Sequence, residues 1–104
     1  MKPIITAICY DKRGRILSVG RNSYVKTHPM QAKMAAQVGS PSRIFLHAEM
    51  DAILKVRDWN RIHRMTVVRL NKEGKEMCAK PCPICQRMIE LVGIKDVSHT
   101  WSKI

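Results

Sequence analysis

The stretch HAEMDAILKVRDW, residues 47–59, decides how this chain folds. Its apolar residues recur at the spacing that places them along one side of a helix, and they are Ala52, Ile53, Val56 and Trp59. A one-sided apolar stripe is typical of a helix that packs on a sheet. We therefore expect a helix over Ala48 to Trp59, with its polar side turned to water.

A second segment, KPCPIC at residues 80–85, precedes another helical pattern. Pro83 suits the first turn of a helix, where the backbone needs no N–H donor. The apolar residues that follow again lie on one side of a helix, and they are Ile84, Met88, Leu91 and Val92. Gly93 is a typical residue for the end of a helix. The pattern predicts a helix from about Cys82 to Val92.

The rest of the chain reads as strands and one short helix. The β-branched run Ile4 to Tyr10, a turn at residues 11–14 and the segment Arg15 to Gly20 predict a β-hairpin in which Gly14 takes a positive φ. The other expected elements are a short helix that starts at Pro29 and stops at Gly39, a strand over Met65 to Leu70, a polar loop over Asn71 to Lys80, and a last strand over Ile94 to Trp101. These elements predict one α/β domain over residues 1–104, with a mixed sheet of about four strands.

Composition limits the class of protein and suggests its partners. The chain has 104 residues with 19 Lys and Arg against 8 Asp and Glu, so its formal net charge is +11. A strongly basic domain points to an anionic partner, such as a nucleic acid or a phosphorylated small molecule. A hydrophobic content of 45% argues against disorder, and no apolar run is long enough for a membrane span. The first residues lack the pattern of a signal peptide, so we expect a cytoplasmic protein whose four cysteines stay reduced.

His47, Glu49, Cys82 and Cys85 have the residue types of a catalytic zinc site. Cys82 and Cys85 are three residues apart, so both sulfurs project from one side of a helix and can reach one ion. His47 can supply a third ligand if it stands at the start of its helix, because residues two apart in mid-helix face different ways. Three protein ligands leave the fourth tetrahedral position open for water. Glu49 is then the candidate for moving protons.

A structural zinc site remains an alternative. Cys78 lies four residues before Cys82 and could complete a Cys₃His set, in which Glu49 would have no role. Cys9 alternates with apolar residues in the first strand, which favours a place in the core.

The H-x-E pattern of HAEMDAI together with the P-C-x-x-C pattern of KPCPIC resembles the cytidine and deoxycytidylate deaminase superfamily. The similarity is greatest to the branch of deoxycytidylate and tRNA adenosine deaminases, and it runs from about Ile4 to Trp101. The resemblance implies a three-layer type of fold, with a zinc ion between two helix N-termini. It also implies substrate contacts near the site, from Asn22, Ala48, Lys80 and Pro81.

The chain departs from that family in its outer elements. Family members usually have a helix before the first strand and often a helix and strand after the last one, and these elements are missing from residues 1–104. One face of the sheet is then expected to be thinly covered. The segment from Thr27 to Val38 or a second subunit could fill the gap, and we expect a homo-oligomer.

The resemblance implies hydrolytic deamination of a cytosine base in a free nucleotide or nucleoside, with release of ammonia. The alternative is deamination of cytosine or adenine within single-stranded DNA or RNA, which the charge of +11 favours. The chain has few aromatic residues on which successive bases could stack, and this favours the free nucleotide. A third hypothesis is a zinc module that binds nucleic acid without catalysis.

Overall fold

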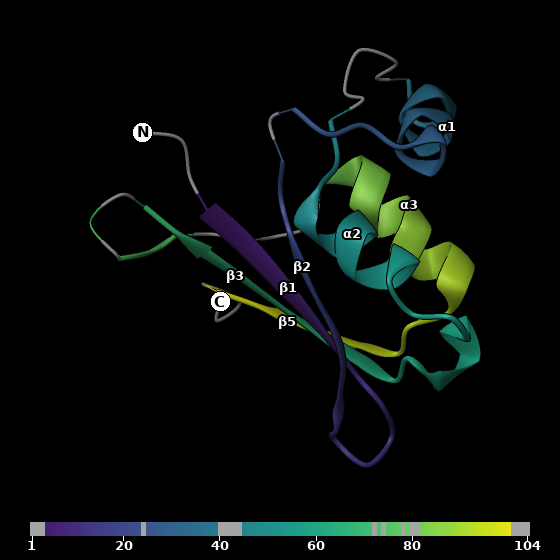
Figure 1. Cartoon of the computed structure of the whole chain (residues 1–104), viewed down its shortest axis with the longest axis vertical. Coiled ribbons are helices and arrows are strands. Elements are labelled where there is room, and N and C mark those ends of the chain that lie inside the picture. The colour runs from purple at the N-terminus through teal and green to yellow at the C-terminus, as the bar shows by residue number, and fades with distance from the viewer. Residues whose placement is uncertain are drawn as a thin grey trace.

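The computed structural model describes residues 4–23, 25–39, 45–71, 73, 75–77, 79 and 82–100. In this part of the chain, three α-helices lie on the same side of a mixed five-stranded sheet (Figure 1). The strands are β1 (Ile4–Tyr10), β2 (Ile16–Arg21), β3 (Arg64–Leu70), β4 (Glu76–Met77) and β5 (Asp96–His99). The helices are α1 (Pro29–Gln37), α2 (Ala48–Leu54) and α3 (Pro83–Val92), with a 3-10 helix, η1 (Trp59–Arg61). The α/β class is thereby confirmed.

The sheet is built around the pairing of β1 with β3. β1 pairs antiparallel with β2 on one side and with β3 on the other. The far side of β3 pairs with β4 near Leu70 and, in parallel, with β5 from Arg64 to Val67. The parallel pair requires a crossover, and the segment that contains α3 supplies it.

The expected β-hairpin is confirmed, and one carboxylate organises its turn. The backbone N–H groups of Arg13 and Arg15 both donate to Oδ1 of Asp11 at 2.9 Å. Nε of Arg15 lies 2.9 Å from the other oxygen, Oδ2. Gly14 has a φ of +82°, a conformation that glycine adopts without a steric penalty.

Two expectations need correction. The helix expected over Ala48 to Trp59 ends at Leu54, because Asp58 begins a separate turn by accepting the N–H of Asn60, and the indole of Trp59 donates to the carbonyl of Ile53 at 3.0 Å. The sheet has five strands instead of about four, because β4 forms within the expected polar loop. Asn71 turns the chain there by accepting the N–H groups of Glu73 and Lys75, which returns β4 to the edge of β3.

Helix α2 packs unusually close to β2. A Cβ at Gly20 would overlap the backbone nitrogen of Ala52 and the carbonyl oxygen of Ala48. The hydroxyl of Ser18 donates to the carbonyl of Ala52 at 2.7 Å. Side chains of α2 also reach the outer edge of β2, where Asp51 accepts the N–H of Arg21 at 3.0 Å and Lys55 donates to the carbonyl of Val19 at 3.0 Å. α2 therefore sits in a fixed position on the sheet.

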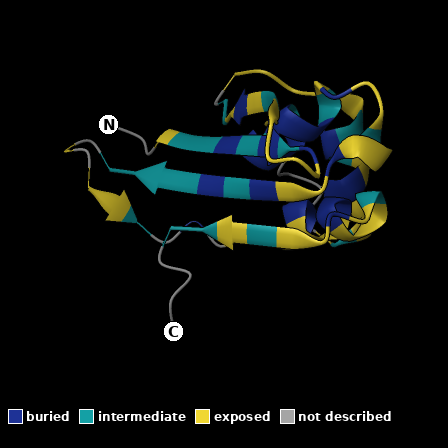
Figure 2. Ribbon diagram, turned by 90° about the horizontal axis from the view of Figure 1, so that it is seen from below, coloured by how far each residue is buried: buried dark blue, intermediate teal, exposed yellow. Residues whose placement is uncertain are grey.

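The core lies between the sheet and the helices. Its largest fully buried apolar side chains come from all three helices and from β3, and they include Met34, Met50, Ile53, Met65, Ile84 and Met88. Buried and partly exposed residues alternate along β1 and β3 (Figure 2). None of the helices in the described ranges has the length and apolar character of a membrane span.

The opposite face of the sheet carries no helix within the described residues (Figure 1). α1 packs beside α3 on the helical side, so the segment from Thr27 to Val38 does not cover this open face. Ile16 and Val19 are 61% and 40% exposed, and Ile4 at the edge of β1 is 53% exposed. In the described residues the fold thus has two layers, and a third layer is not among them.

Candidate metal centre

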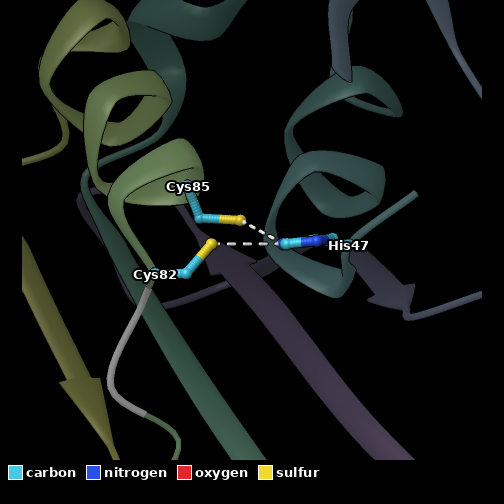
Figure 3. Close-up of side chains that lie close together, drawn as sticks. All are labelled: His47, Cys82 and Cys85. Atoms are coloured by element: carbon cyan, nitrogen blue, oxygen red, sulfur yellow. Dashed lines mark hydrogen bonds between the residues drawn. The ribbon is translucent and has the colours of Figure 1, made fainter. Parts of the chain in front are cut away.

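Three side chains expected to bind zinc lie together at one point between α2 and α3 (Figure 3). Nδ1 of His47 lies 3.3 Å from Sγ of Cys82 and 3.3 Å from Sγ of Cys85. The three candidate ligand atoms all lie within 4.8 Å of one another. Residues more than thirty positions apart in the sequence are thus brought to a separation that one ion can bridge.

The starts of the two helices position these side chains. His47 is the N-cap residue of α2, with an extended backbone (φ −84°, ψ 156°), which is the place at the helix start that the sequence analysis required of a candidate ligand. Cys82 is the N-cap residue of α3, and Cys85 lies one turn further along, after Pro83. The unpaired N–H groups at a helix start carry partial positive charge, which favours thiolate sulfur over the neutral thiol.

The thiol groups of Cys82 and Cys85 have pKa values that are shifted in opposite directions. A hydrogen bond from Cys85, aided by His47, lowers the pKa of Cys82 to about 3. The hydrogen bond to Cys82 and burial raise the pKa of Cys85 well above its usual value. The two shifts have a shared cause, because a proton held between the two sulfurs leaves the pair with one negative charge.

The residues fit a zinc ion. Tetrahedral zinc with ordinary bond lengths sets sulfur and imidazole nitrogen about 3.6 Å apart. The observed separations of 3.3 Å need only a small outward shift of the side chains. Two soft sulfurs and an imidazole are a set that zinc prefers, and among the described residues the cluster has these three members, as a catalytic site with an open position would.

Glu49 lies in the first turn of α2, next to this cluster, and only 6% of its surface is exposed. Burial raises the pKa of its carboxyl group, and interactions with its own backbone N–H, with His47 and with Cys85 oppose that rise. A buried carboxyl group that contacts the sulfur of Cys85 is placed to exchange protons inside the site.

The buried side-chain amide of Gln31 accepts a hydrogen bond from the backbone of His47, and the sequence analysis did not predict this contact. The backbone N–H of His47 donates to Oε1 of Gln31 at 3.3 Å, and Gln31 on α1 is fully buried. The sequence held one signal for it, since a polar residue between the apolar positions Met30 and Met34 stands next to the buried side of a short helix.

The structure also places the other residues singled out from the sequence. Oδ1 of Asn22 accepts the N–H of Ile5 at 2.9 Å, and Asn22 lines a pocket of about 530 Å³ together with Leu46, the residue before His47. Neither His47 nor Glu49 lines that pocket. Ala48 is fully buried at the start of α2. The roles of Asn22 and Ala48 as substrate contacts stay predictions. Lys80, Pro81 and Cys78 lie outside the described residues.

Cys9 is the other cysteine among the described residues, and it behaves as expected for a core residue. Cys9 is fully buried in β1, and burial raises the pKa of its thiol. It is not a member of the cluster formed by His47, Cys82 and Cys85.

Comparison with known families gives one match that spans almost the whole chain. The model of the cytidine and deoxycytidylate deaminase zinc-binding region matches residues 1–100. A search of curated protein sequences finds no significant match. The matched range contains the three clustered residues and Glu49.

Proposed function

Because the chain belongs to the cytidine and deoxycytidylate deaminase family, we propose that it hydrolyses the exocyclic amino group of cytosine in a free nucleotide or nucleoside. The observation that carries this proposal is the position of Glu49, buried beside the cluster of His47, Cys82 and Cys85. A structural metal site has no use for such a carboxyl group, whereas a hydrolytic deaminase needs one.

His47, Cys82 and Cys85 would hold the zinc ion, and they are fixed by the starts of two helices. When bound, zinc supplies an acidic water molecule, so that hydroxide is available near neutral pH. The ligands keep their place because α2 is fastened to β2 and because Gln31 accepts the N–H of His47.

Glu49 would carry the protons of the reaction. Its carboxylate takes the proton that the attacking water releases, and it delivers this proton to the ring nitrogen beside the attacked carbon. It then takes the second proton of that water, from the hydroxyl now bound to the attacked carbon, and gives it to the amino group. The carbon–nitrogen bond breaks, so that water and cytosine become uracil and ammonia. Burial supports this role, because a raised carboxyl pKa brings the acid and base forms closer in free energy near neutral pH.

Replacement of Glu49 by glutamine tests the proposal. Glu49→Gln keeps the shape of the side chain and removes the proton carrier, so we expect turnover of cytidine or a cytosine mononucleotide to fall by about 10²- to 10⁴-fold. Zinc content and the unfolding transition should change little. The matched control is Glu90→Gln, the same change at an exposed position on α3, which should keep full activity. Unchanged turnover in Glu49→Gln would overturn this assignment.

Deamination within a single-stranded polynucleotide is the second candidate, because the chain is strongly basic. Ammonia release from nucleosides, nucleotides and oligonucleotides, measured over a range of salt concentrations, separates the two. A pocket for one nucleotide gives a shallow salt dependence, whereas a polynucleotide substrate gives a steep one. We expect turnover of the free compounds and a shallow slope. Turnover confined to oligonucleotides would favour the second candidate.

A further inference from the structure

A second concave site, here called the basic pocket, lies far from the candidate metal centre. Its volume is about 450 Å³, and its lining includes Lys12, Arg13, Arg15, Trp59, Arg61 and Lys95. These residues come from three separate segments: the turn between β1 and β2, the 3-10 helix η1, and the connection from α3 to β5. Figure 1 shows η1 and the connection from α3 to β5 near the ends of α2 and α3, with the turn between β1 and β2 below them. The starts of these two helices, in contrast, hold the candidate metal centre.

The basic pocket has a large excess of positive charge. Five of its lining side chains are lysines or arginines, and its one lining carboxylate is Asp11. That carboxylate is already bound to the side chain of Arg15 and to two backbone N–H groups. Within the described ranges, no carboxylate lies within 4.0 Å of the charged groups of Lys12, Arg13, Arg61 or Lys95. A nearby hollow of about 330 Å³ shares Lys12 and Arg13 and adds Arg64 and a second carboxylate, Asp96.

Ordinary structural roles explain only part of this cluster. Lys95 lies just after the C-terminal end of α3, where a cation interacts favourably with the helix dipole. The same explanation does not apply to Lys12 and Arg13, which lie in a hairpin turn. Like charges from separate segments repel one another when they line one pocket. A bound polyanion would relieve that repulsion.

Trp59 adds an aromatic wall to the basic pocket. Its indole Nε1 donates to the carbonyl of Ile53 at 3.0 Å, so the orientation of the half-buried ring is fixed. Aromatic faces that stand beside cations are typical of sites for single-stranded nucleic acids, where unpaired bases stack on the ring and the cations contact phosphates. Bases within a duplex are already stacked and cannot use such a wall.

We propose that the basic pocket binds single-stranded nucleic acid, with Lys12, Arg13, Arg61 and Lys95 on its phosphates and Trp59 against a base. The length of α3, ten residues or about 15 Å, separates this site from the candidate metal centre. The site therefore extends the chain's interactions beyond the proposed deamination, and binding is measurable without turnover.

The test compares two pairs of substitutions that remove the same charge. Lys12→Gln with Lys95→Gln removes two lysines of the basic pocket, and Lys33→Gln with Lys75→Gln removes two exposed lysines outside its lining. Binding of a labelled 20-nucleotide single strand is followed by fluorescence anisotropy between about 50 and 200 mM salt. We expect the first pair to reduce the salt slope by about 1.4 and the affinity at 0.1 M salt by about tenfold or more. The control pair should retain the wild-type slope, and thermal melting verifies that both variants are folded.

A second measurement follows the stacking contact. Trp101→Phe leaves Trp59 as the sole tryptophan of the chain, so its fluorescence reports on the basic pocket alone. We expect the single strand to quench this fluorescence, and a duplex of the same length to quench it less. Equal weakening by the two lysine pairs would overturn the proposal. Equal quenching by duplex, or full competition by a nucleoside triphosphate at an equal phosphate concentration, would also overturn it.

Discussion

Gly20 of β2 lies against Ala52 of α2 so closely that no side chain fits between them. The contact sets the distance between the helix and the sheet, and the hydroxyl of Ser18 reinforces it by donating to the carbonyl of Ala52. Because His47 and Glu49 occupy the first positions of the same helix, this distance also sets their position relative to the cysteines of α3.

Gly20→Ala should therefore disturb the candidate metal centre from a distance. A methyl group would overlap the backbone at Ala52 and Ala48, and overpacking of this kind costs about 1–3 kcal/mol. We expect a lower urea midpoint together with weaker zinc binding, measured by competition with a chelating dye. Ser18→Ala removes the hydrogen bond without adding volume, so it should lower stability and weaken zinc binding less than Gly20→Ala does. Zinc affinity equal to wild type in Gly20→Ala would show that α2 can shift without moving His47.

The sequence was sufficient for those features that depend on local spacing. His47, Cys82 and Cys85 could be predicted as a cluster because each stands at a helix start, and a helix start is marked by nearby residues such as Pro83. The end of α2 could not be predicted, because the contact of the Trp59 indole with Ile53 overrides the apolar periodicity. β4 was missed because its pairing depends on an edge of β3 that only the folded sheet provides.

Loss of a ligand should remove metal and stability together. We expect the purified protein to hold one zinc ion per chain, and Cys85→Ser to lose both the metal and part of the thermal stability, because zinc binding and folding are coupled in small domains. Cys9→Ala is the control, since Cys9 is buried outside the cluster and should keep the zinc. Metal analysis and thermal melting give the result. Loss of zinc in Cys78→Ser would instead support a structural Cys₃His site.

Gln31→Met tests the support of His47 from α1. Methionine has a similar volume but cannot accept the N–H of His47, and leaving a buried donor unpaired costs about 1–3 kcal/mol. We also expect lower turnover, because the start of α2 loses a contact that orients it. Met34→Leu, a volume-conserving change on the same helix, should cost less than about 1.5 kcal/mol. Equal losses of stability and of turnover in Gln31→Met and Met34→Leu would show that Gln31 contributes through packing alone.

Stability should fall in acid through Asp11. Backbone hydrogen bonds from Arg15 and Arg13, with the charge of Arg15, hold the pKa of this carboxyl below its usual value. A lowered folded-state pKa stabilises the fold above the unfolded-state pKa of about 3.9, and this contribution is lost as the pH falls towards the folded-state value. Asp11→Asn should therefore be less stable than wild type at pH 7, and the difference should shrink below about pH 4. Urea unfolding at both pH values measures it, and a difference that stays constant would contradict the assignment.

Self-association should bury the open face of the sheet. Exposed Ile16 and Val19 lie there without a covering helix among the described residues, and such apolar patches favour contact with a second copy. We expect light scattering to give a mass of at least twice 11.9 kDa at micromolar concentration. Ile16→Lys should shift the protein towards the monomer. Leu91→Lys, which changes an equally prominent apolar residue on α3, should not. If light scattering instead gives the mass of a monomer for the wild-type protein, the open face of the sheet does not drive self-association.

The contacts of α2 with the outer edge of β2 also bear on aggregation. The N–H of Arg21 and the carbonyl of Val19 point away from β1, where a foreign strand could otherwise pair with them. Asp51 accepts a hydrogen bond from the N–H of Arg21, and Lys55 donates one to the carbonyl of Val19. Asp51 and Lys55 also form an ion pair with each other at 3.1 Å. The same helix that presents the candidate catalytic residues thus removes two of the backbone groups that β2 offers to a foreign strand, which makes strand addition at this edge less favourable while α2 is docked.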